Sequence, residues 1–192
     1  DRKETEMNRF VDDLMNKMTL EEKVGQLNLV SVGFDITGPI LSENVEEKIK
    51  AGQVGGVFNT FTPVAVRKLQ NIAVNETRLG IPLLSGYDVI HGHKTIFPIP
   101  LGLSASWDMD LIGRVARVSA DEASADGVNW IYSPMVDIVR DPRWGRVSES
   151  NGEDPYLSSC IARTMVENFQ LDDLSKENTV MACLKHFALY GA

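Results

Sequence analysis

Several charged and aromatic residues that can do chemistry come soon after short apolar segments of the chain. These residues are Tyr87, Asp88, His91, Arg143, Trp144, Arg146, Glu149, Lys185 and His186. A carboxylate accepts hydrogen bonds from two hydroxyl groups at once, guanidinium and ammonium groups donate them, and an aromatic face packs against the C–H face of a sugar ring. The residue types therefore indicate a pocket for a neutral, polyhydroxylated ligand, and a carbohydrate is the natural candidate.

Some of these residues have to be weighed against a structural role. Asp88 is a lone carboxylate directly after an apolar segment, a placement that is costly unless the group is used or paired, so a functional role is favoured. Asp141, Arg143 and Arg146 lie close together in the sequence and can instead pair with one another to hold a long loop. Both interpretations of these three residues stay open.

Other catalytic motifs are weak or missing in the sequence. His91 and His93 are two positions apart, and Asp88 or His186 could complete a metal site with them, but the spacing fixes no third ligand. The glycines of residues 52–56 are not followed by the Lys-Ser or Lys-Thr of a phosphate-binding loop, and there is no Gly-x-Ser-x-Gly elbow for a serine nucleophile. We therefore expect neither a metal ion nor a cofactor.

Short apolar runs and helical patterns alternate along the chain. The predicted buried strands are 27–32, 54–58, 81–85, 129–133 and 180–184, and the predicted helices between them are 44–50, 64–78, 109–125 and 156–169. A helical arm over 5–18 precedes them, and a capping box at 19–22 opens a further helix. This alternation predicts a parallel α/β sheet, in which the working residues lie just past the C-terminal ends of the strands.

The spacing of the strands bears on how much of a fold the chain contains. The strand starts are about 38 residues apart on average, so an eight-unit barrel built at this rate would need roughly 300 residues, against a typical ~250. The chain has 192 residues, and its five predicted units reach only part of the way around such a barrel. We see no linker or repeat that marks an internal domain boundary.

Composition excludes several classes of protein and partner. Hydrophobic residues make up 43% of the chain, enough for a sizeable core. The 19 basic and 27 acidic residues give a net charge of −8, which argues against a nucleic-acid partner. No apolar run has bilayer length and residues 1–10 contain no apolar signal region, so membrane insertion is not expected. Cys160 and Cys183 are interpreted as free thiols.

The motifs together resemble a known family. They are the segments 86–92, 95–98, 141–146, 153–157 and 185–187, and they are similar to the N-terminal domain of glycoside hydrolase family 3, most of all to its bacterial periplasmic β-glucosidases. The resemblance runs over essentially the whole chain. It implies that 1–192 is the N-terminal portion, about five βα units with a helical arm, of a (β/α)8 TIM-type barrel that precedes an α/β-sandwich domain.

The resemblance also assigns roles to residues. It implies that Asp88, Arg146, Lys185 and His186 bind the glycone, the sugar next to the cleaved bond. Residues expected to support them are Tyr87, His91, Arg143, Trp144 and Glu149. The nucleophilic Asp and the acid/base Glu are expected C-terminal to Ala192, so no catalytic residue is expected in this segment, and the 192-residue chain alone is expected to be inactive.

The implied function is exo-acting, retaining hydrolysis of terminal non-reducing β-D-glucosyl residues in the full-length protein. Alternatives are a β-xylosidase of the same family, a non-catalytic carbohydrate-binding module, and a metal-dependent hydrolase that uses His91, His93 and Asp88. The β-N-acetylglucosaminidase branch is disfavoured because Ala-Leu-Tyr follows the Lys-His-Phe of 185–187. The expected partners are a β-linked oligosaccharide or glucoside and the rest of the same chain, which closes the barrel. The expected location is the periplasm or the outside of the cell.

Overall fold

The computed structural model describes residues 2–32 and 44–191, with side chains from residue 4 onward. Residues 1, 33–43 and 192 of the predicted domain lie outside that description. The chain forms two compact units. The first unit comprises Asp1–Phe58 and Arg67–Leu84, and the second comprises Asn59–Val66 and Ser85–Ala192. All of the predicted site residues belong to the second unit.

The first unit contains the N-terminal helices and two parallel strands. Its elements are α1 (Arg2–Lys17), α2 (Leu20–Gln26), β1 (Leu29–Ser31), α3 (Val45–Lys50), β2 (Gly56–Phe58) and most of α4 (Pro63–Asn75). The predicted capping box is present, since Thr19 accepts from the backbone of Glu22 and the Glu22 carboxylate accepts from the backbone of Thr19. Val30 of β1 lies opposite Val57 of β2, and both belong to the apolar core of this unit.

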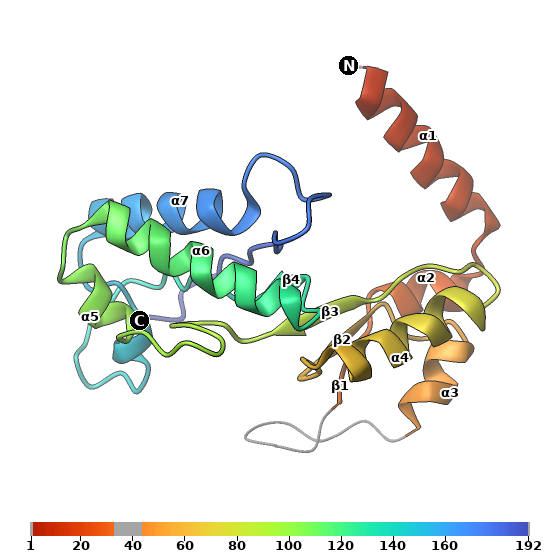
Figure 1. Ribbon diagram of the computed structural model, residues 1–192, viewed down its shortest axis with the longest axis horizontal. Coiled ribbons are helices and arrows are strands. Elements are labelled where there is room, and N and C mark those ends of the chain that lie inside the picture. The colour runs from red at the N-terminus through yellow and green to blue at the C-terminus, as the bar shows by residue number, and fades with distance from the viewer. Residues whose placement is uncertain (1, 33–43, 192) are drawn as a thin grey trace. The chain divides into compact units, whose positions relative to one another are not determined.

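The second unit carries its core between two long helices and the strand pair. Its elements are β3 (Leu84–Tyr87, shared with the first unit at Leu84), α5 (Pro100–Ser104), α6 (Met109–Ala125), β4 (Trp130–Ile131), the 3₁₀ turn η1 (Val147–Glu149) and α7 (Pro155–Gln170). Strands β3 and β4 are parallel, with Tyr87 opposite Ile131. Helices α6 and α7 pack side by side (Figure 1), and Ala116, Ile161 and Phe169 are buried in the core between them.

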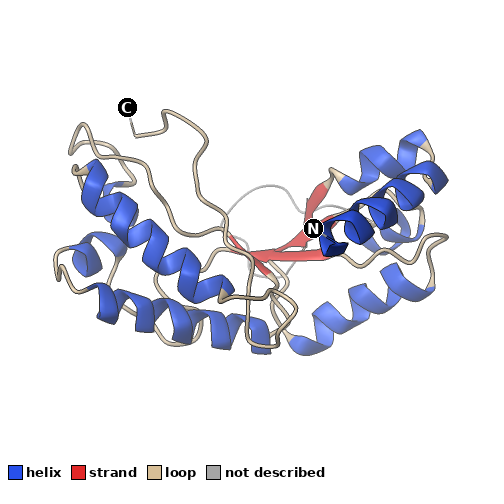
Figure 2. Cartoon of the chain, turned by 90° about the horizontal axis from the view of Figure 1, so that it is seen from above, coloured by secondary structure: helices blue, strands red, loops and turns tan. Residues whose placement is uncertain are grey.

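The helix predictions agree with the structure more closely than the strand predictions do. Helix α6 covers the predicted range 109–125, whereas β4 is shorter than 129–133. The predicted strand 180–184 is wrong as a continuous strand, because the segment makes only the isolated parallel bridges Trp130↔Met181 and Met135↔Lys185 and is drawn as loop after α7 (Figure 2). Pro134 lies between the two bridged positions and has no N–H to donate, so a regular ladder is interrupted there.

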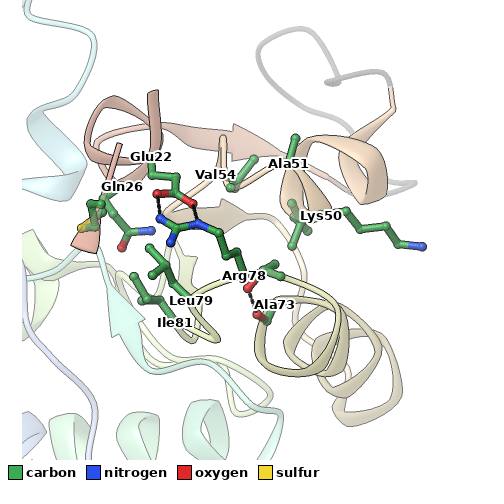
Figure 3. Close-up of a pocket in the computed structure, with 13 residues that line it drawn as sticks. Glu22, Gln26, Lys50, Ala51, Val54, Ala73, Arg78, Leu79 and Ile81 are labelled. Atoms are coloured by element: carbon green, nitrogen blue, oxygen red, sulfur yellow. Dashed lines mark hydrogen bonds and ion pairs between the residues drawn. The ribbon is translucent and has the colours of Figure 1, made fainter. Parts of the chain in front are cut away.

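A pocket of about 110 Å³ lies in the first unit (Figure 3). Arg78 lines this pocket and donates to Glu22 from Nε at 3.0 Å and to the Lys17 carbonyl at 2.8 Å. Gln26 and Val54 also line the pocket, and they come shortly before strands β1 and β2 respectively. The pocket therefore lies toward the N-terminal ends of the strands, where the side chains of barrel folds contribute to stability rather than to the reaction.

No helix in the described part of the chain is long and apolar enough to cross a membrane.

Candidate functional site

An ion pair joins the ends of two segments that are far apart in the sequence. Asp88 directly follows β3, and its Oδ1 accepts a hydrogen bond from Nζ of Lys185 at 2.8 Å. The Lys185 side chain is 11% exposed and that of Asp88 is 46% exposed. The backbone N–H of Lys185 donates to the Pro134 carbonyl, and its carbonyl accepts from the N–H of Val136. These two hydrogen bonds fix the backbone from which the Lys185 side chain extends. The ammonium is thus buried against a carboxylate that still faces solvent.

Arg146 is held by a two-pronged contact with Glu149 on the 3₁₀ turn η1. Its Nε donates to Oε1 at 2.7 Å and its Nη2 donates to Oε2 at 2.6 Å, the geometry in which a guanidinium binds a carboxylate best. These hydrogen bonds lower the pKa of Glu149 against the opposing effect of burial, and the charge of Lys185 lowers it further. The same pair raises the pKa of Arg146. Both groups are therefore charged at neutral pH.

His186 connects Arg146 to a further carboxylate that was not among the predicted site residues. Its Nε2 lies 3.3 Å from Nη1 of Arg146, and its Nδ1 lies 2.8 Å from Oδ2 of Asp137. The backbone N–H of His186 also donates to that oxygen, at 3.0 Å. Asp137 lies in the polar stretch just past β4, and that position was the sequence signal that could have identified it.

Aromatic rings cover one side of this cluster. The ring of Tyr190 lies 4.5 Å from that of His186 and meets the ring of Trp144 edge-on at 5.7 Å, measured between ring centroids. The guanidinium carbon of Arg146 lies 5.3 Å from the centre of the Tyr190 ring, within cation–π range. Trp144 therefore contacts the cluster through Tyr190, a residue that the sequence prediction did not single out.

Three of the predicted supporting residues make contacts elsewhere. Arg143 is 90% exposed at its side chain and pairs with Asp141, which is the structural role left open for this loop. His91 binds the Phe97 carbonyl through Nδ1 at 2.9 Å. The ring of Tyr87 packs against aromatic neighbours, with Phe61 at 4.9 Å between centroids. These contacts engage the three residues with partners outside the predicted glycone-binding set.

The two histidines of the metal hypothesis are engaged separately. His93 is 3% exposed at its side chain, and its Nε2 binds Asp126 at 2.8 Å, whereas His91 binds a backbone carbonyl. Within residues 2–32 and 44–191, no group of three His, Cys, Asp or Glu side chains is arranged to hold a metal ion. The geometry thus gives the metal-dependent alternative no support from these histidines.

The connected cluster formed by Asp88, Lys185, His186, Arg146, Glu149 and Asp137 combines fixed donors and fixed acceptors. Each sugar hydroxyl can donate one hydrogen bond and accept others, so it is matched by a carboxylate beside an ammonium or guanidinium group. Asp88 and Lys185 provide one such combination at 2.8 Å, and Glu149 and Arg146 provide a second at 2.6 Å. The arrangement can bind and orient several hydroxyl groups of one ligand.

Comparison with known proteins shows the family of this chain. The model of the glycosyl hydrolase family 3 N-terminal domain matches residues 19–192. The chain belongs to this family. A periplasmic beta-glucosidase of Salmonella typhimurium is 51% identical over 183 residues, which are 95% of this chain and 23% of the relative. A putative beta-xylosidase of Formosa agariphila is 37% identical over 199 residues, covering 94% of this chain and 26% of the relative.

A solved structure is also similar to this chain. The crystal structure of a mutant beta-glucosidase from Listeria innocua in complex with laminaribiose superposes with a TM-score of 0.84 at 41% identity, over 96% of this chain and 27% of that chain. The predicted recognition of the family and the predicted α/β, TIM-barrel fold class are thereby confirmed. The chain spans about a quarter of the length of these relatives.

Proposed function

We propose that this chain forms the sugar-binding part of the barrel in a longer, exo-acting, retaining β-glucosidase. In this proposal Asp88, Arg146, Lys185 and His186 bind the terminal β-D-glucosyl unit, and the nucleophile and acid/base lie outside residues 1–192. The observation that carries the proposal is the convergence of these four side chains, from three segments of the second unit, into contacts of 2.8 and 3.3 Å. The beta-glucosidase names of the Salmonella and Listeria relatives support the glucosyl preference.

The charges in the cluster suit a reaction that passes through a positively charged sugar. A retaining glycosidase has an oxocarbenium-like transition state, in which the hydroxyl groups become more acidic and donate more strongly. An ionised acceptor such as Asp88 then gains strength between the bound substrate and the transition state, which is the condition for a contact to raise the rate. Lys185 holds Asp88 in place for this role.

The proposal is tested by turnover of 4-nitrophenyl β-D-glucopyranoside by the full-length protein. We expect hydrolysis with retention of the β-anomer, seen by NMR of the first product, and slower hydrolysis of the corresponding β-D-xylopyranoside. A higher kcat/KM for the xyloside would favour the β-xylosidase alternative, which the Formosa relative supports. Sugar binding with no turnover by the full-length protein would instead favour a non-catalytic binding module. Turnover by the isolated chain would contradict the placement of the nucleophile.

A matched pair of arginine variants tests the site itself. Arg146 and Arg143 lie in one loop and each pairs with a carboxylate, but of the two it is Arg146 that also reaches His186. We expect R146Q to lower kcat/KM by about a hundredfold, because hydrogen bonds to charged groups are worth about 1.5–3 kcal/mol. R143Q should stay within about threefold of the unaltered protein, as exposed ion pairs contribute little. Equal losses in the two variants would remove Arg146 from the site.

We also propose a periplasmic or secreted location for the full-length protein, on the basis of the Salmonella relative's name. Cell fractionation followed by the same glucosidase assay tests this. Activity that stays with cytoplasmic markers would contradict it.

A further inference from the structure

Asp137 is a buried carboxylate that the proposed sugar-binding role does not use. Its side chain is 4% exposed, and its Oδ2 contacts His186 twice, at the ring Nδ1 (2.8 Å) and at the backbone N–H (3.0 Å). A buried carboxylate is tolerated only when hydrogen bonds replace the water that it has lost. Both of these hydrogen bonds come from one residue, and that residue belongs to the proposed glycone site.

The contact on the other side of the ring decides where His186 carries its proton. Nη1 of Arg146 lies 3.3 Å from Nε2 of His186. A guanidinium has donors and no acceptor, so Nε2 has to present a lone pair to it. A neutral imidazole with a lone pair on Nε2 carries its proton on Nδ1, and that proton is donated to Asp137. Arg146 and Asp137 thus select the same tautomer of His186.

The backbone around Asp137 is itself held by buried polar groups. Ser150 is fully buried and donates from Oγ to the Asp137 carbonyl oxygen at 2.7 Å. Asn151 donates to the Met135 carbonyl at 3.3 Å. Asp137 is consequently attached at its carbonyl as well as at its carboxylate, so the segment after β4 can fix the orientation of the imidazole.

We infer that Asp137 is a positioning residue that holds His186 in the Nδ1–H tautomer, so that the single lone pair of Nε2, which accepts from Arg146 at 3.3 Å in the free site, accepts instead from a hydroxyl group of the bound sugar. The inference rests on the proposed function, because it names the direction of one hydrogen bond in that site. Arg146 and Lys185 can only donate to the sugar. His186 therefore supplies an acceptor that these two residues cannot, and the hydroxyl group that binds it is the donor.

The test uses the full-length protein and the variants D137N, H186A and D137N/H186A. Asp126 provides the matched control, since it is also buried and also binds a histidine ring at 2.8 Å, that of His93. We expect D137N to lower kcat/KM for 4-nitrophenyl β-D-glucopyranoside by about tenfold to hundredfold, the range of one hydrogen bond to a charged group. That loss should shrink to about twofold when His186 is already absent, because coupled residues are not additive. D126N should stay within about twofold of the unaltered protein.

A full D137N loss in the H186A background, or no loss at all, would overturn the inference, because a positioning residue acts only through its partner. If D137N does not fold, the tautomer of His186 can still be measured in the unaltered protein. With ¹⁵N-labelled histidine, NMR should show His186, assigned by comparison with H186A, protonated at Nδ1 and unprotonated at Nε2. The opposite tautomer would refute the inference. This readout does not depend on turnover, so it separates failure of the inference from failure of the proposed glucosidase function.

Discussion

Replacing Asp88 with asparagine removes one charge from the proposed glycone site and keeps the shape of the side chain. A carboxylate offers about four lone-pair positions, and one of them is taken by Lys185 at 2.8 Å. The side chain is 46% exposed, which leaves room for two sugar hydroxyl groups on the remaining positions. The side-chain amide of D88N would still accept from Lys185 and from a hydroxyl group, but as a neutral acceptor.

The size of the effect follows from the difference between charged and neutral acceptors. A hydrogen bond to a charged group is worth about 1.5–3 kcal/mol and a neutral one about 0.5–1.5 kcal/mol, so each exchange costs about 1–1.5 kcal/mol. Two hydroxyl contacts then give about 2–3 kcal/mol, which corresponds to a loss in kcat/KM of about 30-fold to 150-fold. The contact with Lys185 is present in the free protein, and we take it to persist with substrate, so that it largely cancels from kcat/KM.

The assay is steady-state hydrolysis of 4-nitrophenyl β-D-glucopyranoside by the full-length protein, with the melting temperature measured in parallel. D88N should melt close to the unaltered protein, because a half-exposed ion pair adds only about 0–1 kcal/mol. D141N is the matched control, as Asp141 pairs with the exposed Arg143 and should change kcat/KM by less than about twofold. A folded D88N protein with kcat/KM within about threefold of the unaltered protein would refute the reasoning.

Three further changes test the surroundings of the site and the fold. Hydrogen bonds from Arg146 keep the pKa of Glu149 below its ordinary value of 4.5, so Glu149 adds stability above that value that is lost as the pH falls through the lowered pKa. E149Q should therefore reduce the free energy of unfolding at pH 7, and urea titrations should show the deficit disappearing in acid; a deficit independent of pH would exclude this linkage. T19A removes the side-chain cap of α2 and should cost about 1 kcal/mol in the same titration, with no change refuting the capping role. A Cβ at Gly86 would lie 2.0 Å from the Tyr132 hydroxyl, so G86A should destabilise by about 1–3 kcal/mol or more, and an unchanged melting temperature would contradict that packing.

Local residue patterns account for most helices in the described part of the chain, although α5 (Pro100–Ser104) was not predicted. The periodic apolar positions of 109–125 predicted α6 with the bounds that the structure has, and Thr19 and Glu22 predicted the cap of α2. Both features depend on residues within a few positions of one another, because backbone hydrogen bonds of a helix and its cap are local. The segment 180–184 was predicted wrongly because a strand depends on its neighbour, and that neighbour contains Pro134.

Residue types and their order along the chain also indicated which residues belong near the site. Asp88, Lys185 and His186 were predicted because side chains just past parallel strands converge at one edge, and the motifs resembled family 3. The positions of these residues in the sequence did not indicate which groups they would hydrogen-bond. Lys185 pairs with a residue 97 positions away, and His186 pairs with Asp137, which is 49 positions away.

The partners themselves depend on the folded chain. Residue types and spacing alone left both Arg143 and Arg146 open to a structural role, although the family resemblance implied sugar binding by Arg146. The structure directs Arg143 to solvent with Asp141 and Arg146 toward His186. A hydrogen bond requires two polar atoms within about 3 Å and a suitable angle, so it depends on coordinates that no residue pattern specifies. The kind of chemistry could therefore be proposed from the sequence, whereas only the folded chain decides which atoms share each hydrogen bond.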